Sequence, residues 1–190
     1  MKRRFSKSLG RRTHSNPDSP VATIAEEESL VHLGKLPHEP FILVLDQVQD
    51  PRNLGACLRS ADGAGVDLVV LPSDRSAGLT EVVRHVACGA VENLLITRVG
   101  NLARYLENLT SLGIHLIGTS DQAQKPLFDV EVSGPCGLIM GAEETGIRRL
   151  TAKLCDELVY IPMVGKVECL NVSVATGICL FELSRQLGKF

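Results

Sequence analysis

The stretch FILVLDQVQDPRNLGACLRSADGAGVDLVVL, residues 41–71, changes its pattern from strand to helix and back to strand. Residues 41–46 are a short apolar run rich in β-forming side chains, which predicts a buried strand. Residues 52–65 have helical periodicity, follow Asp50-Pro51 and end in glycines, as helices commonly do. The next apolar run, at 67–71, predicts a second strand, and two apolar strands joined by a helix indicate a parallel pair.

The same alternation continues to the end of the chain. Further strands are expected at 93–99, 114–119, 137–144 and 157–162, and further helices at 79–88, 101–113, 147–155 and 171–187. Because strands that are apolar throughout are buried on both faces, we predict an α/β fold with helices on both faces of a mostly parallel sheet of about six strands. Ligands of such sheets bind outside the carboxyl ends of the strands, so function is expected in the loops after those ends.

The composition is that of an ordinary globular protein. The chain has 190 residues, of which 44% are hydrophobic and 22% are charged, enough for one domain and a tail. No apolar run approaches the roughly 20 residues that cross a bilayer, and no apolar segment follows the basic N-terminus, so neither a membrane span nor a secretory signal is expected. The six cysteines form no close C-x-x-C pair, which disfavours a zinc site. Four of them lie in apolar helix or strand patterns, where a reduced thiol packs as a small apolar group: Cys57, Cys136, Cys155 and Cys179. This pattern favours a reducing, cytoplasmic location over a disulfide framework.

The first 40 residues differ from the rest of the chain. Residues 1–16 contain six Lys or Arg side chains and no acidic one, which is typical of a solvated tail or, alternatively, of an arm that binds nucleic acid phosphates. Residues 17–40 contain four prolines around an acidic patch and are predicted to be linker. The expected organisation is a flexible tail and linker over residues 1–40 and one domain over residues 41–190.

The helix expected after the first strand contains two candidate site residues, Asn53 and Arg59. Small residues beside Arg59 would let a ligand or another backbone approach closely, but a solvated surface arginine is an equally simple interpretation. Asn53 lies in the first turn, where an amide commonly caps or braces a helix. Spacing alone leaves both residues open between a structural and a functional role.

The strand expected near residue 140 ends in LIMGAEETGIRRL, residues 138–150. Gly141 would allow backbone to approach a ligand at the end of the strand. Glu143 and Glu144 are adjacent on a short turn and therefore point different ways, which disfavours a paired-carboxylate acid–base site. The stretch lacks both the Gly-rich turn of a dinucleotide-binding fingerprint and the Lys-Ser/Thr of a P-loop.

The third loop, MVGKVECLNVSVATG at residues 163–177, joins the last strand to a terminal helix that is apolar nearly all round. A helix that is apolar on all sides is buried on all sides, which indicates packing against a second chain as well as against its own sheet. Asn171 and Ser173 are suitable residues to cap this helix. Cys169 has no histidine near it in the sequence, which disfavours a nucleophilic thiol unless the fold supplies a partner.

Taken together, these loops resemble the three motifs of the SpoU (TrmH) family of RNA 2′-O-ribose methyltransferases, within the SPOUT class. The motifs read DPRNLGACLRSADGAGV, LIMGAEETGIRRL and IPMVGKVECLNVSVATGICLFE, in family order and at family spacing. The resemblance implies S-adenosylmethionine-dependent methylation of a ribose 2′-hydroxyl, first of all that of a guanosine in 23S rRNA, with tRNA as the alternative. It also implies a homodimer through the terminal helix and a C-terminal deep trefoil knot, a topology so rare that periodicity cannot predict it.

The resemblance also assigns roles to individual residues. Matching the motifs position by position gives the catalytic residues Asn53, Arg59, Glu143 and Asn171. The same match gives the cofactor contacts Gly141, Ile161 and Leu170, and no metal is required. For Arg59 the chemistry leaves two roles open, a general base or, because a guanidinium stays protonated, a group that positions phosphate and stabilises charge on the 2′-oxygen.

The chain departs from the family pattern at two positions. Cys169 stands where the family usually has serine, and a thiol is the weaker hydrogen-bond donor. Glu144 stands at a position that is often glycine, which would strain a turn that needs a positive φ. These departures keep a second class of function open, a catalytically silent RNA-binding assembly factor.

Overall fold

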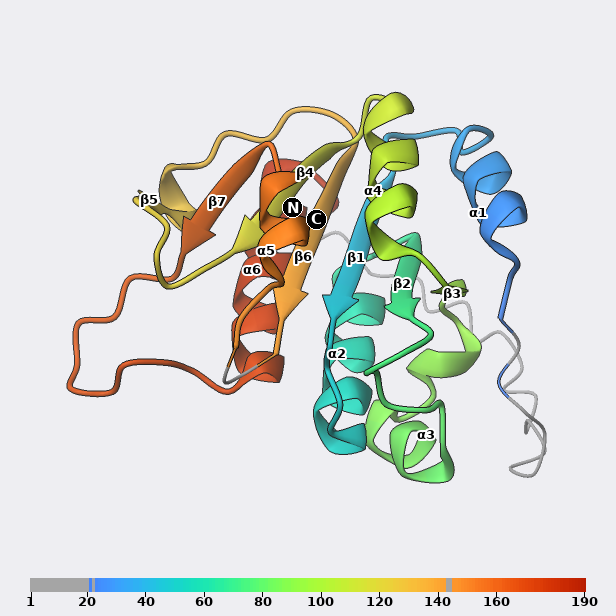
Figure 1. The fold of residues 1–190 in the computed structure, drawn as a ribbon, viewed down its shortest axis with the longest axis horizontal. Coiled ribbons are helices and arrows are strands. Elements are labelled where there is room, and N and C mark those ends of the chain that lie inside the picture. Colours follow the sequence, from blue (N-terminus) through green and yellow to red (C-terminus); the bar gives the residue numbers. More distant parts are fainter. Residues whose placement is uncertain (1–20, 22, 143–144) are drawn as a thin grey trace, which may run out of the picture.

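The structure is a computed structural model that describes residues 21, 23–142 and 145–190. Its centre is a seven-stranded sheet in the order β3-β2-β1-β6-β4-β7-β5, and every pair of neighbouring strands in it is parallel (Figure 1). The strands are β1 (Phe41–Asp46), β2 (Leu68–Pro72), β3 (Ile96–Val99), β4 (His115–Thr119), β5 (Lys125–Pro126), β6 (Cys136–Gly141) and β7 (Glu157–Tyr160).

The α/β prediction is confirmed, and each predicted strand is present. The predicted count of about six is one strand too low. The additional strand is β5, which has only two residues and contains Pro126, so it carries no periodicity that a sequence pattern could reveal. The trefoil knot stays a prediction.

The direction in which the chain adds strands to the sheet reverses beside β1. The chain runs outward from β1 through β2 to β3 and then returns past β1 to form β4 on the other side of β6. The arrows of β1, β2 and β6 point downward in Figure 1, and parallel pairing puts the carboxyl ends of all seven strands at the same edge of the sheet. Ligands of open α/β sheets bind at this edge, where the order of the strands reverses.

Helices cover both faces of the sheet (Figure 1). One face carries α2 (Pro51–Gly63), α3 (Glu81–Ala87), α6 (Val172–Gln186) and the short 3₁₀ helices η1 (Ala90–Glu92) and η2 (Leu127–Asp129); the other carries α1 (Glu26–Leu33), α4 (Leu102–Ser111) and α5 (Arg149–Lys153). Strand β1 is completely buried and contributes to both hydrophobic cores, since its successive side chains alternate between the two faces. In the part of the chain that the structure describes, no helix combines the length and the apolar character needed to cross a membrane.

Helix α1 lies in the segment that the sequence predicted to be linker. Its Ser29 is buried, and the Ser29 Oγ lies 2.5 Å from the hydroxyl of Tyr105 on α4. Just before the helix, the Ile24 N–H donates to the Ile96 carbonyl over 2.9 Å and so covers the outer edge of β3. The linker prediction is therefore wrong at Glu26–Leu33: the prolines lie outside the helix, and its acidic first turn is favourable at a helix N-terminus. The predictions for residues 1–20 lie outside the described residues.

Helices α2 and α6 run side by side in the same direction. Near their first turns, the Asn171 Nδ2 donates to the Asn53 Oδ1 over 3.1 Å. Beyond the last turn of α2, the hydroxyl of Ser184 donates to the carbonyl of Ala64 over 2.8 Å. Both helices therefore begin at the carboxyl edge of the sheet, which brings the first and third sequence motifs together.

The contact between α1 and α4 generates a prediction about stability. Replacing Tyr105 by Phe removes one buried hydrogen bond but leaves the Ser29 hydroxyl its second partner, the Glu26 carbonyl. We expect the free energy of unfolding in urea to fall by about 1 kcal/mol. As the matched control, Ser111→Ala removes an exposed hydroxyl from the same helix and should leave the stability unchanged. Equal stability of wild type and Tyr105→Phe would show that this bond does not hold α1.

Candidate functional site

A cavity of about 480 Å³ opens at the carboxyl edge of the sheet, beside the ends of β4, β6 and β7. Its walls come from the segment after β4, the turn after β6, the end of β7, and the loop that leads into α6. This volume lies within the range of small-molecule sites, which is about 300–1,000 Å³. The cavity therefore lies where the strand order predicts a ligand.

All three residues that the family resemblance assigned to the cofactor line this cavity. Gly141 comes from the end of β6, Ile161 follows β7, and Leu170 lies just before α6. They are distant in sequence and meet only because the ends of parallel strands share one edge. Their role as cofactor contacts stays a prediction.

Gly141 is required by the protein's own backbone. A Cβ atom built on Gly141 would lie 2.0 Å from the carbonyl carbon of Gly146 and 2.1 Å from the nitrogen of Ile147. The chain therefore turns back directly over the end of β6, and two backbone hydrogen bonds between Ala142 and Gly146 close the turn. The sequence had suggested that glycine lets backbone approach a ligand here, whereas the structure shows backbone approaching backbone.

The cavity is lined by apolar side chains together with polar and acidic ones. Apolar walls come from Met140, Val159, Ile161, Leu170 and Val172. Thr119, Ser120, Asp121, Gln122 and Glu168 supply polar groups. No Lys or Arg occurs among the described lining residues, so the walls suit a neutral or cationic ligand better than a phosphorylated one.

Sequence reasoning missed the polar wall that follows β4. Thr119 is the last residue of that strand, and the three residues after it complete the wall. The rule that ligands bind outside the carboxyl ends of strands was the signal that pointed to them. Asp121 and Glu168 belong to no pattern of paired carboxylates in the sequence, so only the fold shows that they share a cavity.

Asn53 and Asn171 lie next to this cavity and are hydrogen-bonded to each other. The Oδ1 of Asn171 also accepts from the Ser173 backbone N–H over 3.0 Å, so Asn171 is the N-cap of α6. This agrees with the capping role that the sequence left open for it. Asn53 is not the cap of α2, because Asp50 accepts from the Arg52 N–H over 2.7 Å. The pair thus joins the starts of two helices at the mouth of the site.

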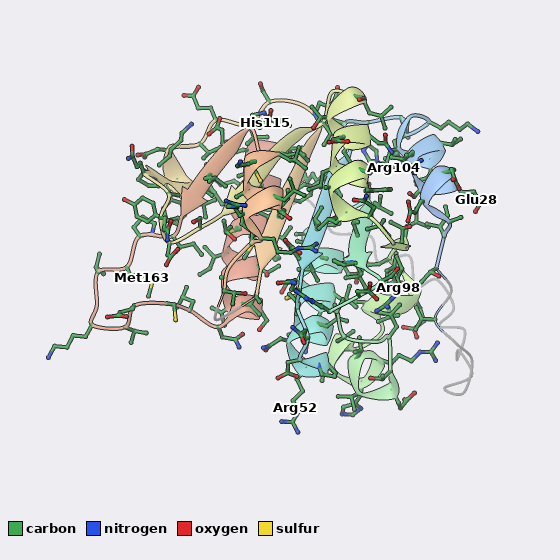
Figure 2. The ribbon with its side chains drawn as sticks, viewed as in Figure 1. Glu28, Arg52, Arg98, Arg104, His115 and Met163 are labelled. Atoms are coloured by element: carbon green, nitrogen blue, oxygen red, sulfur yellow. The ribbon has the colours of Figure 1, made fainter. Side chains whose placement is uncertain are left out.

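Arg59 is exposed and does not line the cavity. It lies two helical turns after Arg52 and on the same side of α2. Figure 2 shows Arg52 at the lower end of the molecule, pointing outward from the first turn of α2. Glu143, the fourth predicted catalytic residue, and its neighbour Glu144 lie outside the described residues.

Cys169 is exposed and forms part of the cavity wall. No histidine occurs among the described lining residues, so the fold brings no base of that type to the thiol. Cys136 and Cys179 are buried, and burial raises the pKa of each of these thiols to about 12. They are therefore neutral packing groups, as the apolar patterns around them predicted. Within the described ranges, no group of three or more His, Cys, Asp or Glu side chains could hold a metal ion.

The outer wall of the cavity belongs to a loop that projects from the molecule. Figure 2 labels Met163 on this loop, and Met163 is one of the lining residues. Val164 on this loop is fully exposed, and Val167 is 65% exposed. Apolar side chains thus extend from the mouth of the cavity into solvent, although most of the protein's large apolar side chains are buried.

The parallel sheet has helices on both faces and a cavity at its carboxyl edge, lined by the loops that follow three strands. These features define an α/β ligand-binding domain. The chain belongs to the SpoU rRNA Methylase family, whose model matches residues 40–181.

Known relatives agree with this membership. The chain is 54% identical over 161 residues to the 23S rRNA (guanosine-2'-O-)-methyltransferase RlmB of Photorhabdus laumondii, an alignment that covers 85% of this chain and 66% of that protein. The crystal structure of an AdoMet-bound rRNA methyltransferase from Sinorhizobium meliloti has a TM-score of 0.73 and 32% identity, covering 80% of this chain and 58% of that one. The crystal structure of the A. aeolicus TrmH/SpoU tRNA modifying enzyme has a TM-score of 0.71 and 26% identity, covering 85% of this chain and 83% of that one. The chain thus spans less than two thirds of the length of both rRNA relatives.

The close approach at Gly141 generates the second prediction. Gly141→Ala should displace the backbone at 146–147 and lower the free energy of unfolding by about 1–3 kcal/mol, the usual cost of overpacking. Urea denaturation measures the change. Gly165→Ala is the matched control, since a Cβ there meets no atom within 4 Å and stability should not change. If both variants are as stable as the wild type, the turn is not packed against β6 in this way.

Proposed function

We propose that the chain is an S-adenosylmethionine-dependent RNA methyltransferase that methylates a ribose 2′-hydroxyl, first of all that of a guanosine in 23S rRNA. The observation that carries this proposal is the cavity in which Gly141, Ile161 and Leu170 meet, with the Asn53–Asn171 pair beside it. The sequence relative from P. laumondii is named as an enzyme of this activity, and the S. meliloti relative was solved with AdoMet bound.

The cavity fits the proposed cofactor. S-adenosylmethionine has an adenine ring, whose flat faces pack against apolar groups, and a positively charged sulfonium, whose methyl group is the one transferred. The apolar wall formed by Ile161 and Leu170 suits the ring, and the carboxylates of Asp121 and Glu168 suit a cation. The absence of Lys and Arg among the described lining residues favours a cationic ligand in the same way.

The two asparagines would orient the RNA. An amide side chain offers both donors and an acceptor, so it can hold a ribose hydroxyl in one direction. Their mutual hydrogen bond and the N-cap bond of Asn171 restrict both side chains before RNA arrives. Orientation matters because a reacting oxygen held in line with the methyl group gains most of the rate enhancement that proximity can supply.

Arg59 would act on the RNA as a charged group. An exposed guanidinium is positively charged, which fits phosphate binding and stabilisation of negative charge on the 2′-oxygen rather than proton abstraction. Its helix face also contains Gly63, where a Cβ would lie 3.6 Å from the ring of Phe181 on α6. Arg59 therefore borders the outer face of α6.

That outer face supports a homodimer. Val174, Ile178 and Phe181 are spaced as one helical stripe, and Val174 and Phe181 are 51% and 46% exposed. The sequence predicted a helix buried on all sides, and in the single chain the two ends of this stripe are exposed while Ile178 packs partly against the core. In a dimer formed through the stripe, Arg59 would lie beside the interface, since its helix face borders Phe181.

Two alternatives rest on particular observations. The A. aeolicus relative is named as a tRNA modifying enzyme, which supports tRNA as the second candidate substrate. Cys169 lies in the cavity wall at a position where the family usually has serine, which is the basis for a catalytically silent RNA-binding factor. A cytoplasmic location belongs to the same proposal.

The enzyme proposal makes a prediction about Arg59. Arg59→Ala should lower the rate of methyl transfer to rRNA by at least about 100-fold, because it removes a charge that stabilises the transition state. Calorimetry should show unchanged S-adenosylmethionine binding, since Arg59 does not line the cavity. Arg104→Ala, on the opposite face of the sheet (Figure 2), is the control and should retain full activity. A wild-type chain that binds no S-adenosylmethionine would overturn the enzyme proposal.

The homodimer makes a separate prediction. Val174→Glu combined with Phe181→Glu should convert the protein to a monomer, because each change places a charge in the proposed apolar interface. Light scattering coupled to size-exclusion chromatography measures the mass. Val82→Glu adds the same charge at a similarly exposed valine on α3 and should leave the dimer intact. A monomeric wild type, or a dimeric double variant, would exclude this interface.

A further inference from the structure

The last residue of β1, Asp46, is a buried carboxylate with no exposed side-chain surface. It accepts two hydrogen bonds from one residue, Arg148. The Arg148 backbone N–H donates to Oδ2 over 3.1 Å, and the Arg148 Nε donates to Oδ1 over 2.8 Å. A carboxylate held by both a backbone amide and a guanidinium of the same residue fixes the position of that residue in two ways.

Arg148 stands where the chain leaves the turn that follows β6. Gly141 pairs with Asp46 across the sheet, so the carboxylate lies at the base of this turn. The returning backbone at Gly146 and Ile147 crosses the end of β6, and Arg148 then reaches the end of β1. The turn is thus held at its base by the pair of bonds to Asp46 and across its width by the bonds between Ala142 and Gly146.

Asp46 is also the point from which the first sequence motif departs. The next residue, Gln47, has a φ of 71° and is buried, so the chain bends sharply away from β1. The Val48 carbonyl then accepts from the Ala77 N–H, and Asp50 caps α2. A short, bonded segment therefore connects Asp46 to Asn53.

We propose that Asp46 and Arg148 are positioning residues that hold the turn after β6 in register with the start of α2. Ala142, Thr145 and Gly146 of this turn line the cavity, and Asn53 lies at its mouth next to Asn171. This ion pair connects the second motif to the strand that leads into the first. The hydrogen bond between Asn53 and Asn171 connects the first motif to the third. Neither residue touches the cavity, so each acts through the backbone that it holds.

A second ion pair in the same chain shows what a purely structural role would look like. Asp67, just before β2, accepts from the Phe41 backbone N–H over 2.8 Å and lies 3.5 Å from the Lys189 Nζ. It is likewise a mostly buried carboxylate bound by one backbone amide and one lysine, and the His38 Nε2 lies 3.5 Å from its other oxygen. It lies at the amino edge of the sheet, where β1 and β2 begin, and so is remote from the cavity.

The inference about catalysis rests on the proposed function, so the test has one measurement that depends on activity and one that does not. In Arg148→Met, hydrogen exchange at the amides of Ala142 and Gly146 should accelerate, because the side-chain bond to Asp46 is lost and only the backbone bond still holds the base of the turn. The kcat for methyl transfer should fall about 10- to 100-fold, the usual effect of a displaced site. Lys189→Met should lower thermal stability and change neither measurement. Arg148→Lys, which keeps the positive charge but not the Nε–H donor, should have an intermediate effect and tests the same point if Arg148→Met does not fold.

Each outcome decides the question. Faster exchange confined to the turn in the Arg148 variants, together with a lowered kcat, supports the positioning role. Exchange and kcat that match those of Lys189→Met would overturn it and leave the pair a structural contact. If the wild type transfers no methyl group, the proposed function fails, and the exchange experiment still shows whether Asp46 holds the turn.

Discussion

The parallel direction of the sheet is the constraint on which the rest of this structure depends. It brings the carboxyl ends of β4, β6 and β7 to one edge, where the loops after them surround a single cavity. A parallel sheet also needs a crossover after each strand, and these crossovers provide the helices of both faces. The same geometry starts α2 and α6 at that edge, so the functional segments converge without being near one another in sequence.

Two polar contacts then set the relative positions of those segments. The amide pair Asn53–Asn171 connects the start of α2 to the start of α6. The ion pair Asp46–Arg148 connects the end of β1 to the turn after β6. Each joins residues at least 100 positions apart along the chain. Because the Asp46 carboxylate is fully buried, loss of its arginine partner is costly and leaves a buried charge without its counterion. The three motifs of the family are thus three parts of one bonded unit.

Much of the fold was predictable from local patterns. The longer strands were evident because each is an uninterrupted apolar run, and most helices because their periodicity is bounded by capping residues and glycines. The patterns failed where local signals conflict with packing. Helix α1 was missed because four prolines flank it in the sequence. Strand β5 was missed because its two residues are too few to show the alternation of a strand. Gly141 was correctly singled out, but for the wrong reason, since what approaches it is the backbone at 146–147.

The sequence by itself determined the α/β class, the family and the identity of the residues that make up the motifs, because these follow from residue type and order. Only the tertiary structure decided which of those residues meet. It placed Gly141, Ile161 and Leu170 in one cavity and left Arg59 on an exposed helix face outside it. It also revealed Asp121, Glu168 and the bond between Asp46 and Arg148. The physical reason is that contacts between distant segments depend on strand order and register, which local periodicity does not encode.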